Sequence, residues 1–147
     1  MEQRISLITL GCRDLARAAR FYSDLGWQKA DSPEEIVAFN LIGQALCLYG
    51  LDDLADDIGV PVETLGRGAV TLAHNLNSPG EVDALVERAV SAGATLLKKP
   101  RKVFWGGYSG YFCDPEGHIW EIAHNPFSPL RAEDGAFRWG GWEPETD

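Results

Sequence analysis

A short stretch in the last third of the chain gathers side chains that can do chemistry. The sequence FWGGYSGYFCDPEGHIWEIAHNP, residues 104–126, holds aromatics, two histidines and Glu121, a carboxylate inside an apolar strand pattern. A carboxylate in such a strand is costly unless it has a partner. Glu121 is therefore interpreted in one of two ways: as a member of an ion pair or hydrogen bond, or as a site group that binds a polar ligand or acts as a base.

Aromatic side chains lie close to Glu121 in the sequence. Trp105, Tyr108 and Tyr111 stand in or beside a glycine-rich segment, and glycine allows the backbone to approach a neighbour closely. These rings predict either a hairpin braced against the core or the wall of a ligand site. Alternation along the last strand places Trp120 on the face opposite Glu121, in the helix-packed core.

The chain has three histidines, His74, His118 and His124. Their spacing lacks the geometry of a metal-binding pair, so packing or surface hydrogen bonding is the first interpretation of each. His74 falls near the end of a strand pattern and is retained as a candidate site residue, because it could pair with Glu121 as acid and base.

Composition limits the classes of function. The 147 residues include 22 acidic and 13 basic side chains, a formal net charge of −9, which argues against nucleic acid and anionic membrane partners. Cys12, Cys47 and Cys113 form no closely spaced pair, so reduced thiols in a cytoplasmic protein are expected. No segment resembles a signal peptide or is long enough to cross a bilayer.

Two halves of the chain repeat one order of elements. The first half predicts a strand (4–12), a helix capped by Asp14 (14–25) and two strands around a glycine turn (36–50). The second half predicts a strand (68–76), a helix with a capping box at Ser78 and Glu81 (81–92), a strand (94–100) and a hairpin around DPEG. We expect an α+β fold of two βαβββ modules, because neither half can bury its apolar face alone.

The expected modules span residues 1–50 and 68–126, joined by a connector, 51–67, with a short helix at Leu51–Ile58. A tail, 127–147, follows them. Phe137, Trp139 and Trp142 in this tail are large enough to need cover from a sheet edge, the site or a second subunit. Arg131 and Arg138 are expected to stack on these rings or to pair with acidic neighbours.

The segments DLARAARFYSDLGW and WGGYSGYFCDPEGHIWEIAHNP, with the repeated order of elements, resemble the vicinal oxygen chelate superfamily. This superfamily includes glyoxalase I, bleomycin-resistance proteins and extradiol dioxygenases. The resemblance runs from about residue 5 to residue 126, and the WGGY segment is similar to a glyoxalase-like subgroup. It implies curved mixed sheets around a cleft with helices on the outer face, a divalent metal in catalytic members, and a homodimer.

Carried over position by position, the family's metal ligands correspond to Leu7, Cys47, Thr71 and Glu121. The family has His, Gln or Glu at most of these positions, and here only Glu121 is a conventional ligand. A leucine cannot coordinate a cation, and a thiol is soft where Mg²⁺ or Mn²⁺ prefers oxygen. We therefore expect no tightly held metal or other cofactor, with a divalent ion bound weakly at most.

Three functions stay open at this point. The first is a protein of the bleomycin-resistance type that binds a small organic molecule, and the others are a metal-dependent glyoxalase-like lyase, isomerase or dioxygenase, and a metal-free enzyme with Glu121 as base. The expected partners are a small-molecule ligand and a second copy of the chain. The candidate catalytic residue is Glu121, and the candidate ligand-binding residues are Trp105, Tyr108, Tyr111, Thr71, Cys47, Leu7 and His74.

Overall fold

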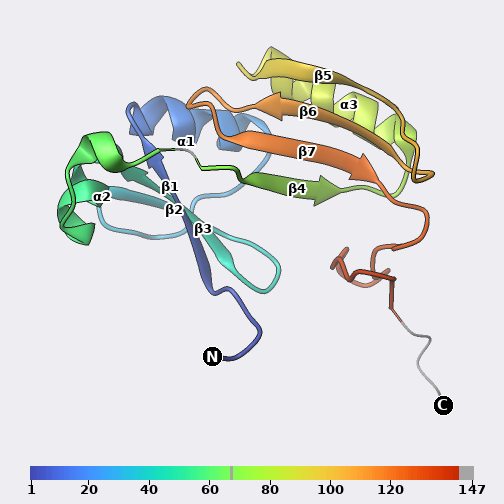
Figure 1. Cartoon of the computed structure of the whole chain (residues 1–147), viewed down its shortest axis with the longest axis horizontal. Helices are drawn as coiled ribbons and strands as arrows, with labels where there is room; N and C mark the ends of the chain where they lie inside the picture. Colours follow the sequence, from blue (N-terminus) through green and yellow to red (C-terminus); the bar gives the residue numbers. More distant parts are fainter. Residues whose placement is uncertain (67, 143–147) are drawn as a thin grey trace. The chain divides into compact units, whose positions relative to one another are not determined.

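The computed structural model describes residues 1–66 and 68–142, which form two compact units (Figure 1). The first unit combines Met1–Val70 with Asp114–His118, and the second begins at Thr71 and holds the remaining described residues. Each unit is a mixed sheet with helices, as the α+β prediction requires. The segment 114–118, expected in the second module, groups with the first. Residue 67 of the expected connector and 143–147 of the expected tail lie outside the described residues.

The first unit is built on a three-stranded sheet of order β1-β3-β2. Its elements are β1 (Leu7–Cys12), α1 (Leu15–Asp24), β2 (Ile36–Asn40), β3 (Ala45–Gly50), α2 (Leu51–Ile58) and a 3₁₀ turn at Val62–Thr64. Strand β1 runs parallel to β3, and β2 runs antiparallel to it. A single antiparallel bridge from Lys29 to Phe39 stands where the predicted module has its remaining strand.

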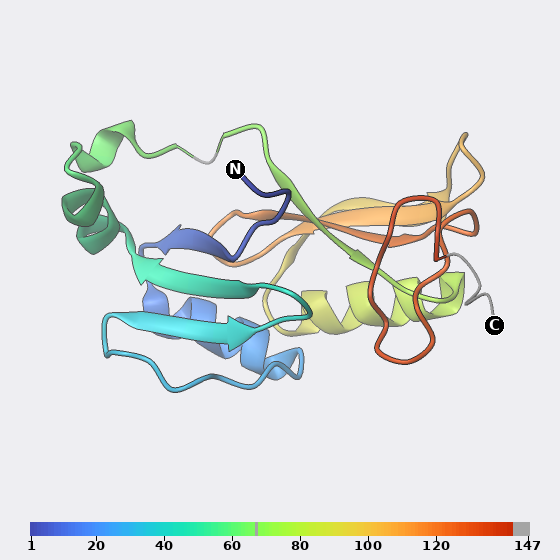
Figure 2. The same ribbon diagram turned by 90° about the horizontal axis from the view of Figure 1, so that it is seen from below.

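Helix α1 lies along one face of this sheet (Figure 2). Asp14 caps it by accepting a hydrogen bond from the Arg17 N–H at 2.9 Å, as the sequence predicted. Tyr22 is buried on this face and its ring contacts Phe39 of β2. Because side chains alternate along a strand, Cys47 points to the face opposite α1.

The second unit repeats the plan around a four-stranded sheet of order β4-β7-β6-β5. Its elements are β4 (Thr71–Asn75), α3 (Pro79–Ser91), β5 (Thr95–Lys102), β6 (Tyr108–Cys113) and β7 (Ile119–His124). The first strand again runs parallel to the last, β4 beside β7, and the other neighbours are antiparallel. The shared order confirms the duplication that the sequence predicted.

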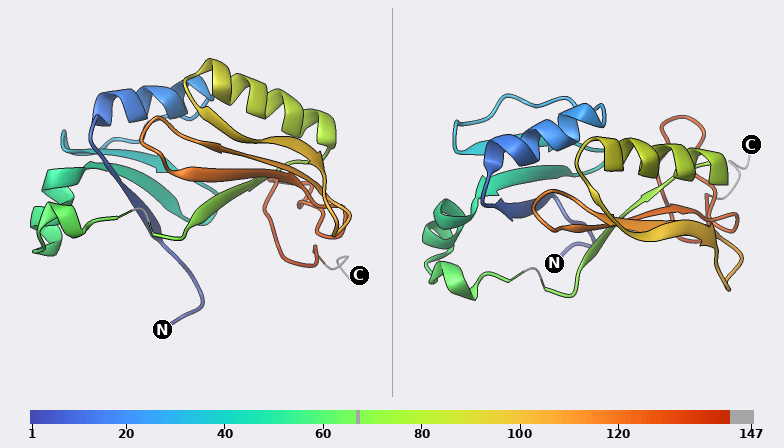
Figure 3. Two further views of the ribbon diagram at one scale, coloured as in Figure 1. Left: turned by 45° about the horizontal axis from the view of Figure 1, so that its top comes forward. Right: turned by 90° about the horizontal axis from the view of Figure 1, so that it is seen from above.

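Helix α3 packs on one face of this second sheet, against β5, β6 and β7 (Figure 3). The Ser78 hydroxyl caps it by accepting from the Glu81 N–H at 3.3 Å. Phe112, Trp120 and Ile122 are buried at 2%, 6% and 1% exposure on the side of the sheet that faces α3. The prediction that Trp120 belongs to the core is confirmed.

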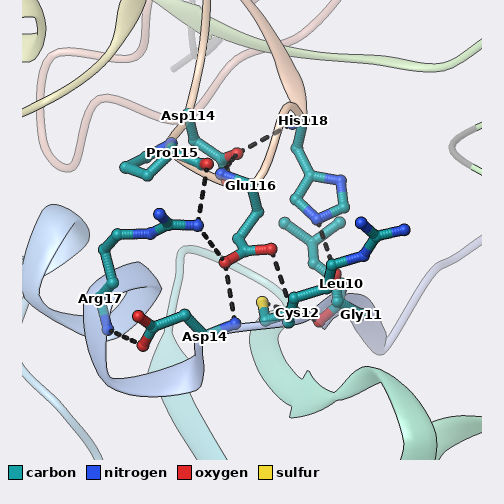
Figure 4. Close-up of polar contacts among 10 residues, drawn as sticks. Leu10, Gly11, Cys12, Asp14, Arg17, Asp114, Pro115, Glu116 and His118 are labelled. Atoms are coloured by element: carbon teal, nitrogen blue, oxygen red, sulfur yellow. Dashed lines mark hydrogen bonds and ion pairs between the residues drawn. The ribbon is translucent and has the colours of Figure 1, made fainter.

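The DPEG turn carries a buried carboxylate that completes the start of α1 (Figure 4). Glu116 accepts hydrogen bonds from the backbone N–H groups of Arg13 at 2.9 Å and Asp14 at 3.0 Å, and from the Arg17 guanidinium at 2.9 Å. Arg17 also donates to the Pro115 carbonyl. Anionic oxygens are stabilised at a helix N-terminus, where backbone N–H groups lack partners within the helix. Burial by itself raises the pKa of Glu116, but these donors outweigh it and hold that pKa below its ordinary value.

Asp114 fixes the other side of the same turn. Its carboxylate accepts from the backbone N–H groups of Glu116 and His118 at 2.9 and 2.8 Å, and from the Tyr22 hydroxyl at 2.6 Å. The His118 ring bonds the Gly11 carbonyl at 3.0 Å (Figure 4). His118 therefore has the hydrogen-bonding role that was its first interpretation.

The described part of the tail stacks on itself. The Arg131 and Arg138 guanidinium groups lie 4.4 and 5.5 Å from the centre of the Trp142 ring, which confirms the expected stacking. Phe137 and Trp139 meet edge to face, and Trp139 remains 85% exposed.

The homodimer stays a prediction. None of the helices described in the structure is both long and apolar enough to span a membrane.

We expect Glu116→Gln to destabilise the protein by about 2–3 kcal/mol at about pH 7, because a charged acceptor with three donors is replaced by a neutral one. The folded-state pKa of Glu116 is lowered, so its stabilisation is complete above the unfolded-state pKa and is lost as pH falls through the folded value. The gap between wild type and Glu116→Gln in urea unfolding should therefore close below about pH 4. Glu34→Gln, at an exposed position, is the matched control, and a pH-independent gap would contradict the expectation.

Trp120→Ala should lower the free energy of unfolding by about 3–5 kcal/mol, because it removes the largest side chain between α3 and its sheet. Chemical denaturation measures the loss. Trp139→Ala serves as the control, since this ring is exposed and its removal should cost little. Equal losses in the two variants would show that the core is not centred on Trp120.

Candidate functional site

Three polar side chains form a row across the face of the second sheet opposite α3, which we call the distal face. Lys98 on β5 pairs with Tyr111 on β6, and Tyr111 pairs with Glu121 on β7. Alternation sends Glu121 away from Trp120 and Ile122, which pack toward α3. All three residues of this polar row are half-buried. The row thus combines an ammonium group, a phenol and a carboxylate on adjacent strands.

Electrostatics within the row link its members. Burial raises the pKa of the Tyr111 hydroxyl, and the negative charge of Glu121 on the neighbouring strand raises it further. The Lys98 ammonium lies 5.8 Å from the centre of the Tyr111 ring, within the range of a cation–π contact. The Glu121 carboxylate and the Lys98 ammonium therefore both act on Tyr111, the middle member of the row.

The sheet register separates the candidate residues of the second unit into two groups. Thr71 pairs with Ile119, so it shares the distal face with Glu121. Tyr108 instead donates to Asp83 of α3 at 2.8 Å and lies on the opposite face. The expectation that Tyr108 joins Glu121 in one ligand wall is thereby corrected. Tyr108 and Tyr111 are three residues apart on one strand, and an odd spacing puts their side chains on opposite faces of the sheet.

His74 also lies apart from Glu121. It pairs with Ile122, whereas Glu121 pairs with Ala73, so period-2 alternation directs His74 and Glu121 to opposite faces of the sheet. This register argues against the acid–base pair considered from the sequence. The remaining histidine, His124, bonds the Leu76 carbonyl at 3.1 Å, in keeping with its first interpretation.

The glycines of the WGGY segment serve close packing. A Cβ atom at Gly107 would lie 1.9 Å from the Trp105 ring, and one at Gly106 would lie 2.9 Å from the Phe127 ring. Gly106 has a φ of +95°, which also favours glycine. Trp105 therefore covers the backbone of its own turn and is 36% exposed. The ligand-binding interpretation of Trp105 stays a prediction.

The candidates of the first unit, Leu7 and Cys47, share the face opposite α1. Cys47 pairs with Thr9 on β1, two residues beyond Leu7. Burial raises the pKa of the Cys47 thiol, which keeps it protonated and weakly nucleophilic. Cys12 is buried as well, and burial together with the charges of Glu116 and Asp114 raises its pKa to about 12. Neither thiol is activated.

The divalent metal of catalytic family members does not fit the donors at the four carried-over positions. Glu121 is the one hard oxygen anion among them, and Leu7 offers no donor. Within residues 1–66 and 68–142, no cluster of three or more His, Cys, Asp or Glu side chains has metal-binding geometry. The metal content of the protein stays a prediction, and no chemical step is derived through a metal.

Three residues of these networks were not singled out in the sequence. Lys98 belongs to the polar row, and Asp114 and Glu116 hold the turn. The lysine had no signal, because Lys99 follows it and only the register selects between them. The turn carboxylates have partners about a hundred residues away, which a local pattern does not reveal.

The sequence and the fold are both similar to those of known proteins. The family model of the Glyoxalase/Bleomycin resistance protein/Dioxygenase superfamily matches residues 4–122. The chain belongs to this superfamily. The structure of a glyoxalase-related enzyme from Fulvimarina pelagi is 39% identical with a TM-score of 0.86, and the match covers 93% of this chain and 98% of that one.

Two further similar proteins are described only as hypothetical or uncharacterized. A hypothetical protein from S. aureus is 25% identical with a TM-score of 0.73, over 85% of this chain and 95% of that chain. An uncharacterized protein from Mycobacterium bovis is 36% identical over 59 residues, which is 40% of this chain. The match spans 37% of the length of that mycobacterial relative.

We expect Glu121→Gln to lower the pKa of Tyr111, because it removes a negative charge that disfavours the tyrosinate. NMR titration of protein with ¹³C-labelled tyrosine measures this pKa. Tyr108 is an internal control, since the carboxylate that raises its pKa belongs to Asp83 and is unchanged. An unaltered Tyr111 titration in the variant would show that the two side chains do not interact.

Proposed function

We propose that this member of the glyoxalase superfamily binds a small organic molecule on the distal face of its second sheet, without a tightly held metal. The observation that carries the proposal is the pairing of Tyr111 with Glu121, which places a phenol and a carboxylate opposite each other on the middle strands. Specific ligand sites commonly combine apolar surface with a few polar groups that fix orientation. Ile119, 36% exposed, and Ala73 supply apolar surface beside the pair.

A second candidate function is a metal-free reaction in which Glu121 accepts a proton from the ligand. The pairing with Tyr111 supports it, because a phenol on the neighbouring strand can donate a hydrogen bond to a ligand oxygen that gains charge. The 39% identity to a protein described as a glyoxalase-related enzyme also supports an enzymatic role. A glyoxalase-like lyase, isomerase or dioxygenase that depends on metal is the alternative, and the poor donor set weighs against it.

The experiment compares ligand binding with and without metal. Protein treated with EDTA is screened by thermal shift against small organic acids, alcohols and phenols, and hits are titrated by NMR. We expect saturable binding that survives EDTA and weakens at least about tenfold in Glu121→Gln, because binding should use the carboxylate. Glu87→Gln on the exposed side of α3 is the matched control.

Two outcomes would contradict the proposal. One is binding that appears only after a divalent metal is added and that disappears with EDTA, which would favour the metal-dependent alternative. The other is binding that is equal in wild type, Glu121→Gln and Glu87→Gln, which would place the ligand elsewhere. Conversion of a bound compound to product without metal, lost in Glu121→Gln, would favour the metal-free enzyme.

A further inference from the structure

We propose that Lys98 is a specificity residue of the distal face, and that the ligand is a small organic acid with a separate hydrogen-bond donor. In this arrangement the acid group pairs with the Lys98 ammonium and the donor binds the Glu121 carboxylate. The inference rests on the proposed function and names the class of ligand for that site.

The first support is the order of charges across the sheet. Neighbouring strands lie about 4.8 Å apart, so the backbones of Lys98 and Glu121, two strands apart, are separated by about 10 Å. Tyr111 stands between them, with the Lys98 ammonium toward its ring. A ligand that lies across Tyr111 therefore meets a cation at one end and an anion at the other.

The second support is the lack of a salt bridge at Lys98. Among the described residues, no carboxylate lies within ion-pair distance of its ammonium. A half-buried charge without a counter-ion is costly, and the cation–π contact with Tyr111 offsets only part of that cost. A ligand carboxylate would supply the missing partner.

The third support is the local charge of β5 in an acidic chain. This strand carries Lys98, Lys99, Arg101 and Lys102, four of the chain's 13 basic residues. Basic side chains on an edge strand commonly prevent unwanted strand pairing, which explains the exposed Lys99, Arg101 and Lys102. It does not explain why Lys98 is half-buried over Tyr111. The basic strand also gives a positive local potential that attracts anions despite the net charge of −9.

The test uses 4-hydroxybenzoate, which has an acid group and a hydroxyl at opposite ends of one ring. Phenol and benzoate are the controls that retain only one of these groups. Binding is followed by ¹H–¹⁵N NMR titration of the full chain, which locates the shifts on β5, β6 and β7. We expect 4-hydroxybenzoate to bind wild type at least about tenfold more tightly than phenol, because only the former pairs with Lys98.

Lys98→Met should bring the affinity for 4-hydroxybenzoate down to about that for phenol, because it removes the charge and keeps most of the length of the side chain. Lys98→Arg, which keeps the charge, should retain the preference for 4-hydroxybenzoate over phenol. Lys99→Met, at the exposed neighbouring position, should retain it as well. Thermal melts establish that each variant is folded, and Lys98→Gln, which also removes the charge, replaces Lys98→Met if that variant does not fold.

The possible failures are distinguishable. Equal affinity for 4-hydroxybenzoate and phenol, or a preference that survives in Lys98→Met, overturns the role of Lys98 and leaves the proposed function standing. A preference that is lost equally in Lys99→Met shows general attraction to the basic strand and also overturns it. If none of the three compounds shifts the resonances of the distal face, this inference is overturned, whereas the proposed function is overturned only by the outcomes given for its own screen.

Discussion

The hydrogen bonds accepted by the Glu116 carboxylate are the interaction on which the first unit depends. The donors are two backbone N–H groups and a guanidinium at the start of α1, although Glu116 lies 103 positions after Arg13 in the sequence. The same turn determines where β7 begins, because Asp114 binds the N–H of His118 immediately before that strand. A shift of one residue in β7 would send Trp120 to the distal face and Glu121 into the core. The buried turn therefore fixes both the helix start and the face on which the candidate site lies.

Most of the fold follows from signals that are local in the sequence. Asp14 and Ser78 cap the helices they were expected to cap, and Gly43 and Gly117 adopt positive φ at the turns between strands. The bridge at Lys29 was not expected, because one pair of residues leaves no alternating pattern. The roles of Asp114 and Glu116 were missed for a different reason. A DPEG turn is typical of an exposed hairpin, and only tertiary contacts show that its carboxylates are buried.

The candidate site was predictable only where alternation along a strand is enough to assign a side chain to a face of the sheet. Alternation along β7 placed Glu121 on the face opposite Trp120, and the structure agrees. Alternation could not assign the tyrosines to a face, because the residue at which β6 begins after the glycine-rich turn was unknown. It also failed on β5, where the register shifts between Leu96 and Lys98 and again before Arg101. Irregular pairing of this kind depends on the neighbouring strand, so Lys98 could not be assigned to a face from its own sequence.

Glu121 stands at a position where the family resemblance implies a metal ligand, and a half-buried carboxylate there needs a partner whether or not a cation is bound. Tyr111 lies opposite it on the neighbouring strand, and the charge of Glu121 raises the pKa of this phenol. Lys98 adds a positive charge on the far side of the same ring. The three other carried-over positions hold Leu7, Cys47 and Thr71, none of which competes for this role. The polar row thus sets a phenol and an ammonium group in line with Glu121 from the chain's own side chains, and this is why we infer binding chemistry centred on β5, β6 and β7.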